Sequence, residues 1–165
     1  MIRILREELA AAGQEAVLRP VSAEWTAVTP AMRRLELAAG PTVESQCQAM
    51  GELPVGSAII TGAGDLAARF MVHVVVRSVD EQVSAPGVQR GLQNGVRRLA
   101  EWGIRGVALP PLGTGAGNLD PDDAAAVMVP VLQRAVDEGA LDAVDIHVES
   151  DYELDVFRRH AERSP

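Results

Sequence analysis

Residues 107–120, VALPPLGTGAGNLD, decide how this chain can fold. The apolar start of this stretch predicts a short buried strand. Its end predicts a helix capped by Asp120, because Pro121 suits the first helical position and acidic residues follow. Between the two, glycines alternate with small residues over residues 113–117. A strand that passes through a glycine-rich turn directly into a helix is typical of α/β proteins, and such a turn can hold a ligand.

The glycine-rich turn is the first candidate ligand site. Glycine has no Cβ, so a ligand can approach the peptide N–H groups closely, and several such groups can point at one phosphate. We therefore predict a phosphate site formed by Gly113, Thr114, Gly115, Ala116 and Gly117. The acids at the start of the next helix would repel a phosphate, so we expect it on the turn and not on that helix end. The spacing is GxGxG and no lysine follows, so neither standard nucleotide pattern is met, and a purely structural tight turn remains the alternative.

The rest of the chain alternates apolar runs with helical patterns. Strands are predicted at residues 2–5, 16–21, 57–61 and 70–76, near residue 107, and at 144–148. Helices are predicted at residues 87–102 and 122–138, from about Tyr152 onward, and as two segments within residues 30–50 that are separated at Gly40 and Pro41. Strands separated by helices indicate an α/β sheet with helices on both faces. No linker or repeat interrupts the pattern, so we expect one domain over residues 1–165.

Composition narrows the classes of protein that the chain can belong to. Hydrophobic residues make up 47% of the chain and the mean hydropathy is +0.07, which favours a filled core over disorder. The net charge of -8 disfavours binding to nucleic acid or to anionic lipid. The first residues, MIRILREEL, are too charged for a signal peptide, and no run approaches the roughly 18 apolar residues that a spanning helix needs. We expect a cytoplasmic protein without membrane contact.

The few sulfur and imidazole side chains give no support for a metal or redox centre. Cys47 is the one cysteine, so an internal disulfide and a cysteine-based zinc cluster are excluded, and a buried thiol is favoured over a nucleophile. The histidines His73, His147 and His160 are far apart in sequence, so no metal site and no cofactor are predicted. His73 lies within an apolar strand pattern and is expected to be a neutral, hydrogen-bonded core residue.

Three segments carry a resemblance to a known family. The segments PVGSAIITGAGDLAARFMVHVVV, GLQNGVRRLAEWGI and VALPPLGTGAGNLDPDDAAAVM resemble the macrodomain family, and the resemblance extends over about residues 2–158. It implies a three-layer α/β/α sandwich around a mixed, mostly parallel central sheet. Family members bind ADP-ribose or related nucleotide metabolites in a cleft, and some hydrolyse ADP-ribosyl esters or remove ADP-ribose from proteins. The resemblance therefore makes ADP-ribose or a related nucleotide the expected ligand, and it leaves the oligomeric state open.

Compared residue by residue, the chain keeps only part of the family's ligand site. Residues 113–117 match the family's diphosphate-binding turn. Glu8 stands where the family has an aspartate that accepts a hydrogen bond from the adenine amino group, and it is either that acceptor or an exposed acid at a helix start. Where the family has two asparagines after the second strand, residues 19–22 read RPVS. The family's first glycine-rich loop is replaced by residues 26–31, TAVTPA, in which the proline removes a backbone donor.

Polar side chains in this altered half are the remaining candidate contacts. Arg19 is either a cation that pairs with a phosphate or carboxylate of the ligand, or the partner of Glu15 or Glu24 in an edge ion pair. Ser22 and Thr29 are further candidate ligand contacts. None of them reproduces the two amides that position a catalytic water in the family's hydrolases.

Two aromatic residues have open roles. Trp25 either covers a base or sugar face or packs on the core as a lid. Tyr152 either replaces the aromatic that stacks on adenine in family members or packs the terminal helix, and the second role is favoured.

Three functions remain open at this level. The first is a divergent macrodomain that binds ADP-ribose or a related phosphate-bearing nucleotide without the usual hydrolase activity. The second is an ADP-ribosyl hydrolase or small-metabolite phosphatase with altered catalytic groups, and the third is an interaction scaffold that binds no small molecule. Convergence of Arg19, Ser22, Glu24 and Thr29 on the glycine-rich turn would favour a ligand site, whereas a cleft filled by Trp25 and Val28 would favour a scaffold.

Overall fold

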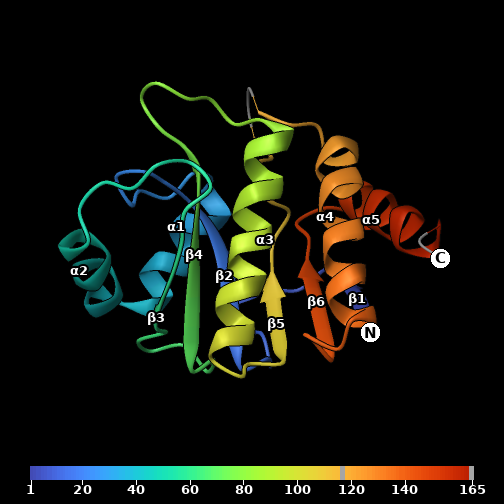
Figure 1. The fold of residues 1–165 in the computed structure, drawn as a ribbon, viewed down its shortest axis with the longest axis horizontal. Coiled ribbons are helices and arrows are strands. Elements are labelled where there is room, and N and C mark those ends of the chain that lie inside the picture. Colours follow the sequence, from blue (N-terminus) through green and yellow to red (C-terminus); the bar gives the residue numbers. More distant parts are fainter. Residues whose placement is uncertain (116–117, 164–165) are drawn as a thin grey trace.

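A six-stranded sheet forms the centre of the computed structural model, which describes residues 1–115 and 118–163. The strands are arranged in the order β1-β6-β5-β2-β4-β3 (Figure 1). Their bounds are β1 Ile2–Leu5, β2 Ala16–Ser22, β3 Ala58–Gly62, β4 Phe70–Arg77, β5 Gly106–Leu109 and β6 Ala143–His147. Only β3 runs antiparallel to its neighbour, β4, and the other pairs are parallel. The sheet is therefore mixed and mostly parallel, as predicted.

Helices cover both faces of this sheet. Figure 1 shows α3 and α4 in front of the strands and α1 behind them. The bounds are α1 Pro30–Ala39, α2 Pro41–Ala49, α3 Ala85–Glu101, α4 Pro121–Asp137 and α5 Asp151–Arg163, with a short 3-10 helix η1 at Leu9–Ala11. The predicted three-layer α/β/α arrangement is thus confirmed.

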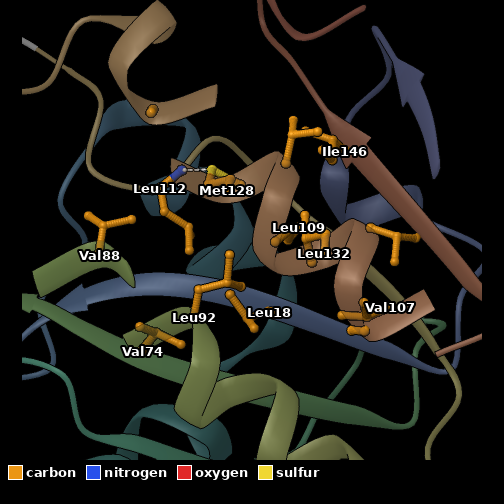
Figure 2. Packing of buried hydrophobic residues seen from close by; sticks show 14 of the residues in the cluster. Leu18, Val74, Val88, Leu92, Val107, Leu109, Leu112, Met128, Leu132 and Ile146 are labelled. Carbon is orange, nitrogen blue, oxygen red and sulfur yellow. Dashed lines mark hydrogen bonds between the residues drawn. The ribbon is translucent and has the colours of Figure 1, made fainter. Parts of the chain in front are cut away.

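Two hydrophobic layers, one on each face of the sheet, hold the helices in place. In β4, Val72 and Val74 face the layer under α3 and α4, while Met71 and Val75 face the layer under α1 and α2. This division follows from the two-residue period of a strand. Figure 2 shows part of the first layer, in which the Leu112 N–H donates to the sulfur of Met128 at 3.1 Å. That bond ties the segment after β5 to the middle of α4.

Local chemistry explains where the helices begin and end. The side chains of Thr29, Ser84 and Asp120 each accept a hydrogen bond from a backbone N–H in the first turn of α1, α3 and α4, respectively. Gly40 separates α1 from α2 with φ at 90°, a value that favours glycine, and Pro41 then starts α2. The predicted helices and strands are present, but η1 was not expected. No helix in residues 1–115 or 118–163 combines the length and apolar character needed to span a membrane.

Candidate functional site

The main cleft lies where the parallel strands end. Its volume is about 690 Å³, within the range of small-molecule sites. Segments that follow β1, β5 and β6 line it together with the end of β2 and the start of α1. Ligand sites in open α/β sheets form at this carboxyl edge, because the loops that leave neighbouring strands meet there. Four predicted site residues line the cleft, namely Glu8, Thr29, Thr114 and Gly115.

The glycine-rich turn has the backbone geometry that its sequence predicts. Gly113 and Gly115 have φ values of 79° and 124°, which side-chain-bearing residues rarely adopt. A Cβ on Gly113 would lie 2.8 Å from Val88 Cγ2, so packing also excludes a larger residue there. The Asn118 N–H donates to the Gly115 carbonyl at 3.1 Å, which closes the turn. The predicted contacts Ala116 and Gly117 lie outside the described residues.

The start of α1 lies against this turn. A Cβ on Gly115 would be 3.2 Å from Thr29 Cγ2, so the turn and the helix start lie close together with no room for a side chain between them. Thr29 Oγ1 accepts from the Met32 N–H at 3.2 Å, and this leaves the hydroxyl proton available to a ligand. Pro30 and Ala31 line the cleft beside Thr29. The positive end of the α1 dipole therefore points at the same space as the glycine turn, which suits an anion.

The start of α4 does not offer the same environment. Asp120 accepts from the Asp122 N–H at 2.9 Å, and Asp122 and Asp123 follow in the first turn. These carboxylates occupy the positive end of the α4 dipole themselves. The start of α4 is therefore a poorer environment for an anion than the space between the turn and α1.

A cluster of charged side chains crosses the other part of the cleft. Arg34 on α1 donates through Nε to Glu8 Oε1 at 3.2 Å and through Nη2 to Glu149 Oε1 at 2.8 Å. Glu8 precedes η1 and Glu149 follows β6, so one guanidinium connects three separate segments. Glu8 lines the cleft and stands at the start of η1 with an exposed, ion-paired carboxylate, so neither interpretation of it is excluded.

Arg19 does not reach the cleft, and both sequence-based interpretations of it are wrong. Its side chain is buried, with 1% of the residue exposed, in the layer under α1 and α2. The Nε–H donates to His73 Nδ1 at 2.8 Å, and Nη2 lies 3.9 Å from Cys47 Sγ. The reason is the strand period: Arg19 stands between Val17 and Val21 on β2, and all three point into that layer.

Ser22 and Trp25 are also placed away from the cleft. Ser22 Oγ accepts from the Thr26 N–H at 3.0 Å and so stabilises a tight turn after β2. Trp25 occupies this turn at φ 68° and is 2% exposed, and its Nε1–H donates to the Gly51 carbonyl at 2.8 Å. Trp25 therefore packs on the core as a lid, and it does not fill the cleft. Of the four polar residues tested for convergence, only Thr29 meets the glycine turn.

Two cleft residues were missed or misjudged from the sequence. Tyr152 is 57% exposed and lines the cleft at the start of α5, so the expectation that it packs the terminal helix is wrong. His147, at the end of β6, also lines the cleft, and its Nδ1 lies 3.0 Å from the Glu7 carbonyl oxygen. Because a carbonyl only accepts, Nδ1 carries a proton. The position of His147 at the end of a predicted parallel strand was the available signal.

Metal ligands do not gather in this site. Across residues 1–115 and 118–163, no three side chains of His, Cys, Asp or Glu are grouped so that they could hold a metal ion. The described lining residues offer backbone N–H donors, hydroxyl groups, carboxylates, the Asn118 amide, the His147 imidazole and the Arg34 guanidinium.

Comparison with known proteins agrees with this architecture. The Macro domain family model matches residues 31–128, more than half of the chain. The chain belongs to the macrodomain family. A macrodomain from Trypanosoma brucei, solved in complex with ADP-ribose, superposes with a TM-score of 0.85 at 16% identity, covering 96% of this chain and 68% of that one. At this identity the likeness shows the shared fold.

Relatives with clearer sequence similarity have different lengths. This macrodomain is 33% identical over 98 residues to an O-acetyl-ADP-ribose deacetylase from Klebsiella pneumoniae, covering 56% of each protein. It is 31% identical over 97 residues to an uncharacterised protein of Mycobacterium tuberculosis, covering 59% of this chain and 27% of that protein. The chain thus spans between about a quarter and just over half of these relatives.

Proposed function

We propose that this macrodomain binds ADP-ribose or a related phosphate-bearing nucleotide in the cleft, with the phosphate on the glycine turn formed by residues 113–117. The observation that carries the proposal is the closeness of Gly115 and Thr29 in the cleft, where a Cβ added to Gly115 would lie 3.2 Å from Thr29 Cγ2. It brings backbone donors of the turn and the positive end of α1 to one space. The family's first glycine loop is replaced here, and the α1 start takes over its place opposite the turn.

The other part of the cleft suits a nucleoside. Tyr152 offers an exposed aromatic face, and Glu8 offers a carboxylate that can accept from an exocyclic amine. The Trypanosoma brucei macrodomain was solved with ADP-ribose, and its likeness in fold supports this class of ligand. The expected complex has the base near Tyr152 and Glu8 and the phosphates near Thr114 and Gly115.

We further propose that binding occurs without the usual hydrolase activity. The end of β2 contributes Pro20 to the cleft, while Arg19 and Ser22 are engaged elsewhere. A proline side chain has no donor or acceptor with which to position a water. The similarity to the Klebsiella pneumoniae deacetylase supports the alternative, hydrolysis of an ADP-ribosyl ester by other groups.

Calorimetric titration tests the binding proposal directly. The purified protein is titrated with ADP-ribose, ADP and AMP at moderate salt, and micromolar dissociation constants are expected for the ligands that carry a diphosphate. Absence of binding to all three would contradict the proposal and favour a scaffold. Incubation with O-acetyl-ADP-ribose and with an ADP-ribosylated protein tests the second point, because turnover above background would establish the hydrolase alternative.

A further inference from the structure

Arg34 is the cationic side chain among many carboxylates that line the cleft. Of the described lining residues, Arg34 alone is an arginine or lysine. The acidic lining residues are Glu7, Glu8, Asp120, Glu149 and Glu153. Each carboxylate disfavours a second negative charge nearby, so a diphosphate in this cleft meets repulsion that the backbone donors must overcome. A cationic side chain that can turn toward the ligand would offset that repulsion.

The partners of Arg34 can be exchanged. The exposed fractions of the side chains are 47% for Arg34, 59% for Glu8 and 55% for Glu149. Ion pairs between such exposed groups contribute little stability, because water solvates both charges when they separate. Asp120 and Glu153 differ, since each already accepts a backbone N–H, from Asp122 and Glu149 respectively. Glu8 and Glu149 therefore hold Arg34 only loosely.

The position of Arg34 on α1 suits it to reach an anion. It lies three residues after Ala31, about one turn from the helix start that faces the glycine turn. Its guanidinium presents parallel N–H donors that match two phosphate oxygens, a match that the single bonds to Glu8 and Glu149 do not use.

We propose that Arg34 is a specificity-determining residue that exchanges Glu8 and Glu149 for a phosphate of the bound ligand. This inference rests on the proposed nucleotide binding and names the residue that selects for the phosphate group. In the unliganded cleft the two glutamates neutralise Arg34. In the complex the phosphate replaces them, so Glu149 competes with the ligand for the same guanidinium.

The exchange predicts that removing the charge of Arg34 and removing the charge of Glu149 change the affinity for ADP in opposite directions. Arg34→Gln weakens ADP binding about tenfold or more, the loss expected for a charge-assisted pair of hydrogen bonds. Glu149→Gln tightens ADP binding severalfold, because it removes the competitor. Arg34→Lys retains part of the affinity, since lysine keeps the positive charge but lacks the two parallel N–H donors of the guanidinium. Adenosine, which has no phosphate, should not lose affinity in Arg34→Gln, since that change removes a phosphate partner and leaves the Glu8 carboxylate free to accept from the base.

The matched control is Arg33→Gln. Arg33 is the neighbouring arginine, pairs with Glu36 at 3.5 Å and does not line the cleft, so this variant makes the same change in net charge and should leave ADP binding unchanged. If Arg34→Gln and Glu149→Gln weaken ADP binding equally, the proposal is wrong, because the ion pair between Arg34 and Glu149 then only shapes the cleft. Unchanged ADP binding in Arg34→Gln would also overturn it. If the unchanged protein binds neither ADP nor ADP-ribose, the proposed function itself fails, and this result is separate from the behaviour of the variants.

Discussion

Arg19 and His73 form a buried hydrogen bond of 2.8 Å between neighbouring positions of β2 and β4. An arginine N–H can only donate, so His73 Nδ1 accepts and the ring proton resides on Nε2. Nε2 lies 2.8 Å from Thr61 Oγ1, which in turn donates to the Gly62 carbonyl. Burial, together with the Arg19 charge, holds the pKa of His73 well below its usual value, so the imidazole is neutral, as its place in an apolar strand predicts.

Stability should therefore fall as the pH is lowered below about 6.5. In the unfolded chain His73 takes up a proton near that pH, whereas the folded protein resists protonation, so the unfolded state binds more protons and gains stability. The free energy of unfolding should therefore be lower at pH 5 than at pH 7.5, and the contribution of His73 is at most about 2 kcal/mol, the free energy of protonating an ordinary imidazole over that range. Urea denaturation at a series of pH values measures this.

Two variants test whether His73 causes this pH dependence of stability. His73→Gln keeps an acceptor for Arg19 and a donor for Thr61, and it should flatten the dependence between pH 7.5 and 5. His160→Gln, which changes a histidine of α5 that contacts Asp122 near the surface, should leave the dependence in place. A dependence that persists in His73→Gln would show that His73 is not its cause.

Cys47 should be unreactive in the folded protein. It is fully buried, and burial raises the pKa of its thiol although Arg19 acts in the opposite direction. A protonated thiol is a poor nucleophile. Reaction with a disulfide reagent at pH 8 should be slow in buffer and should reach one thiol per chain quickly in denaturant. Val79→Cys, at a position that is 82% exposed, should add one fast-reacting thiol. Fast labelling of the unchanged protein would show that Cys47 is accessible.

Asp145 should contribute far more to stability than Asp142, although both accept two bonds from one arginine. Asp145 on β6 is 2% exposed and accepts from Arg3 and Gln14 at 2.8 Å. Burial alone would raise the pKa of Asp145, but these hydrogen bonds outweigh it and lower the pKa below its usual value. Asp145→Asn should therefore cost about 2 kcal/mol at pH 7, the scale of hydrogen bonds to a charged group.

The pH dependence and a second variant show whether the loss of stability in Asp145→Asn comes from the buried, charged carboxylate or would follow from removing any paired aspartate. A depressed carboxyl pKa gives stability that is present at neutral pH and is lost as the pH falls through that pKa, so the cost of Asp145→Asn should shrink below about pH 4. Asp142→Asn should change stability much less, because the bidentate pair of Asp142 with Arg105 is exposed to solvent. Equal effects of the two variants would contradict this account.

The helices and strands could be predicted because the sequence patterns that specify them are local. The apolar run at residues 70–76 became β4, and Gly40 with Pro41 separated α1 from α2, since strand periodicity and a glycine that prefers positive φ are properties of short segments. The capping of α4 by Asp120 was likewise readable from neighbouring residues. Thr29, Thr114 and Gly115 line one cleft because a strand end and a helix start meet at the same sheet edge.

The partners of the arginine side chains could not be predicted from the sequence, and the reason is physical. Arg19 was expected at the ligand or in an edge ion pair, because its partner His73 lies 54 positions away and only the assembled sheet shows that both side chains enter one layer. Arg34 has no local sequence pattern that marks it as a cleft residue, because its shorter hydrogen bond reaches Glu149 at a separation of 115 residues. Pairings between side chains so far apart depend on the packed fold, which short-range patterns do not encode.

Gly115→Val should abolish or strongly weaken ADP-ribose binding while most of the fold remains. The added side chain would crowd Thr29 and cover the donors of the turn, and the φ of 124° adds strain of about 1–3 kcal/mol. Gly139→Val is the matched control, because Gly139 also has positive φ, at 78°, has open space around its Cβ position, and does not line the cleft. Both variants should lose stability in thermal denaturation, but only Gly115→Val should lose binding in calorimetry. If both variants bind ADP-ribose equally well, the phosphate does not lie on the glycine turn, and the ligand must be held by the Glu8 and Tyr152 part of the cleft alone.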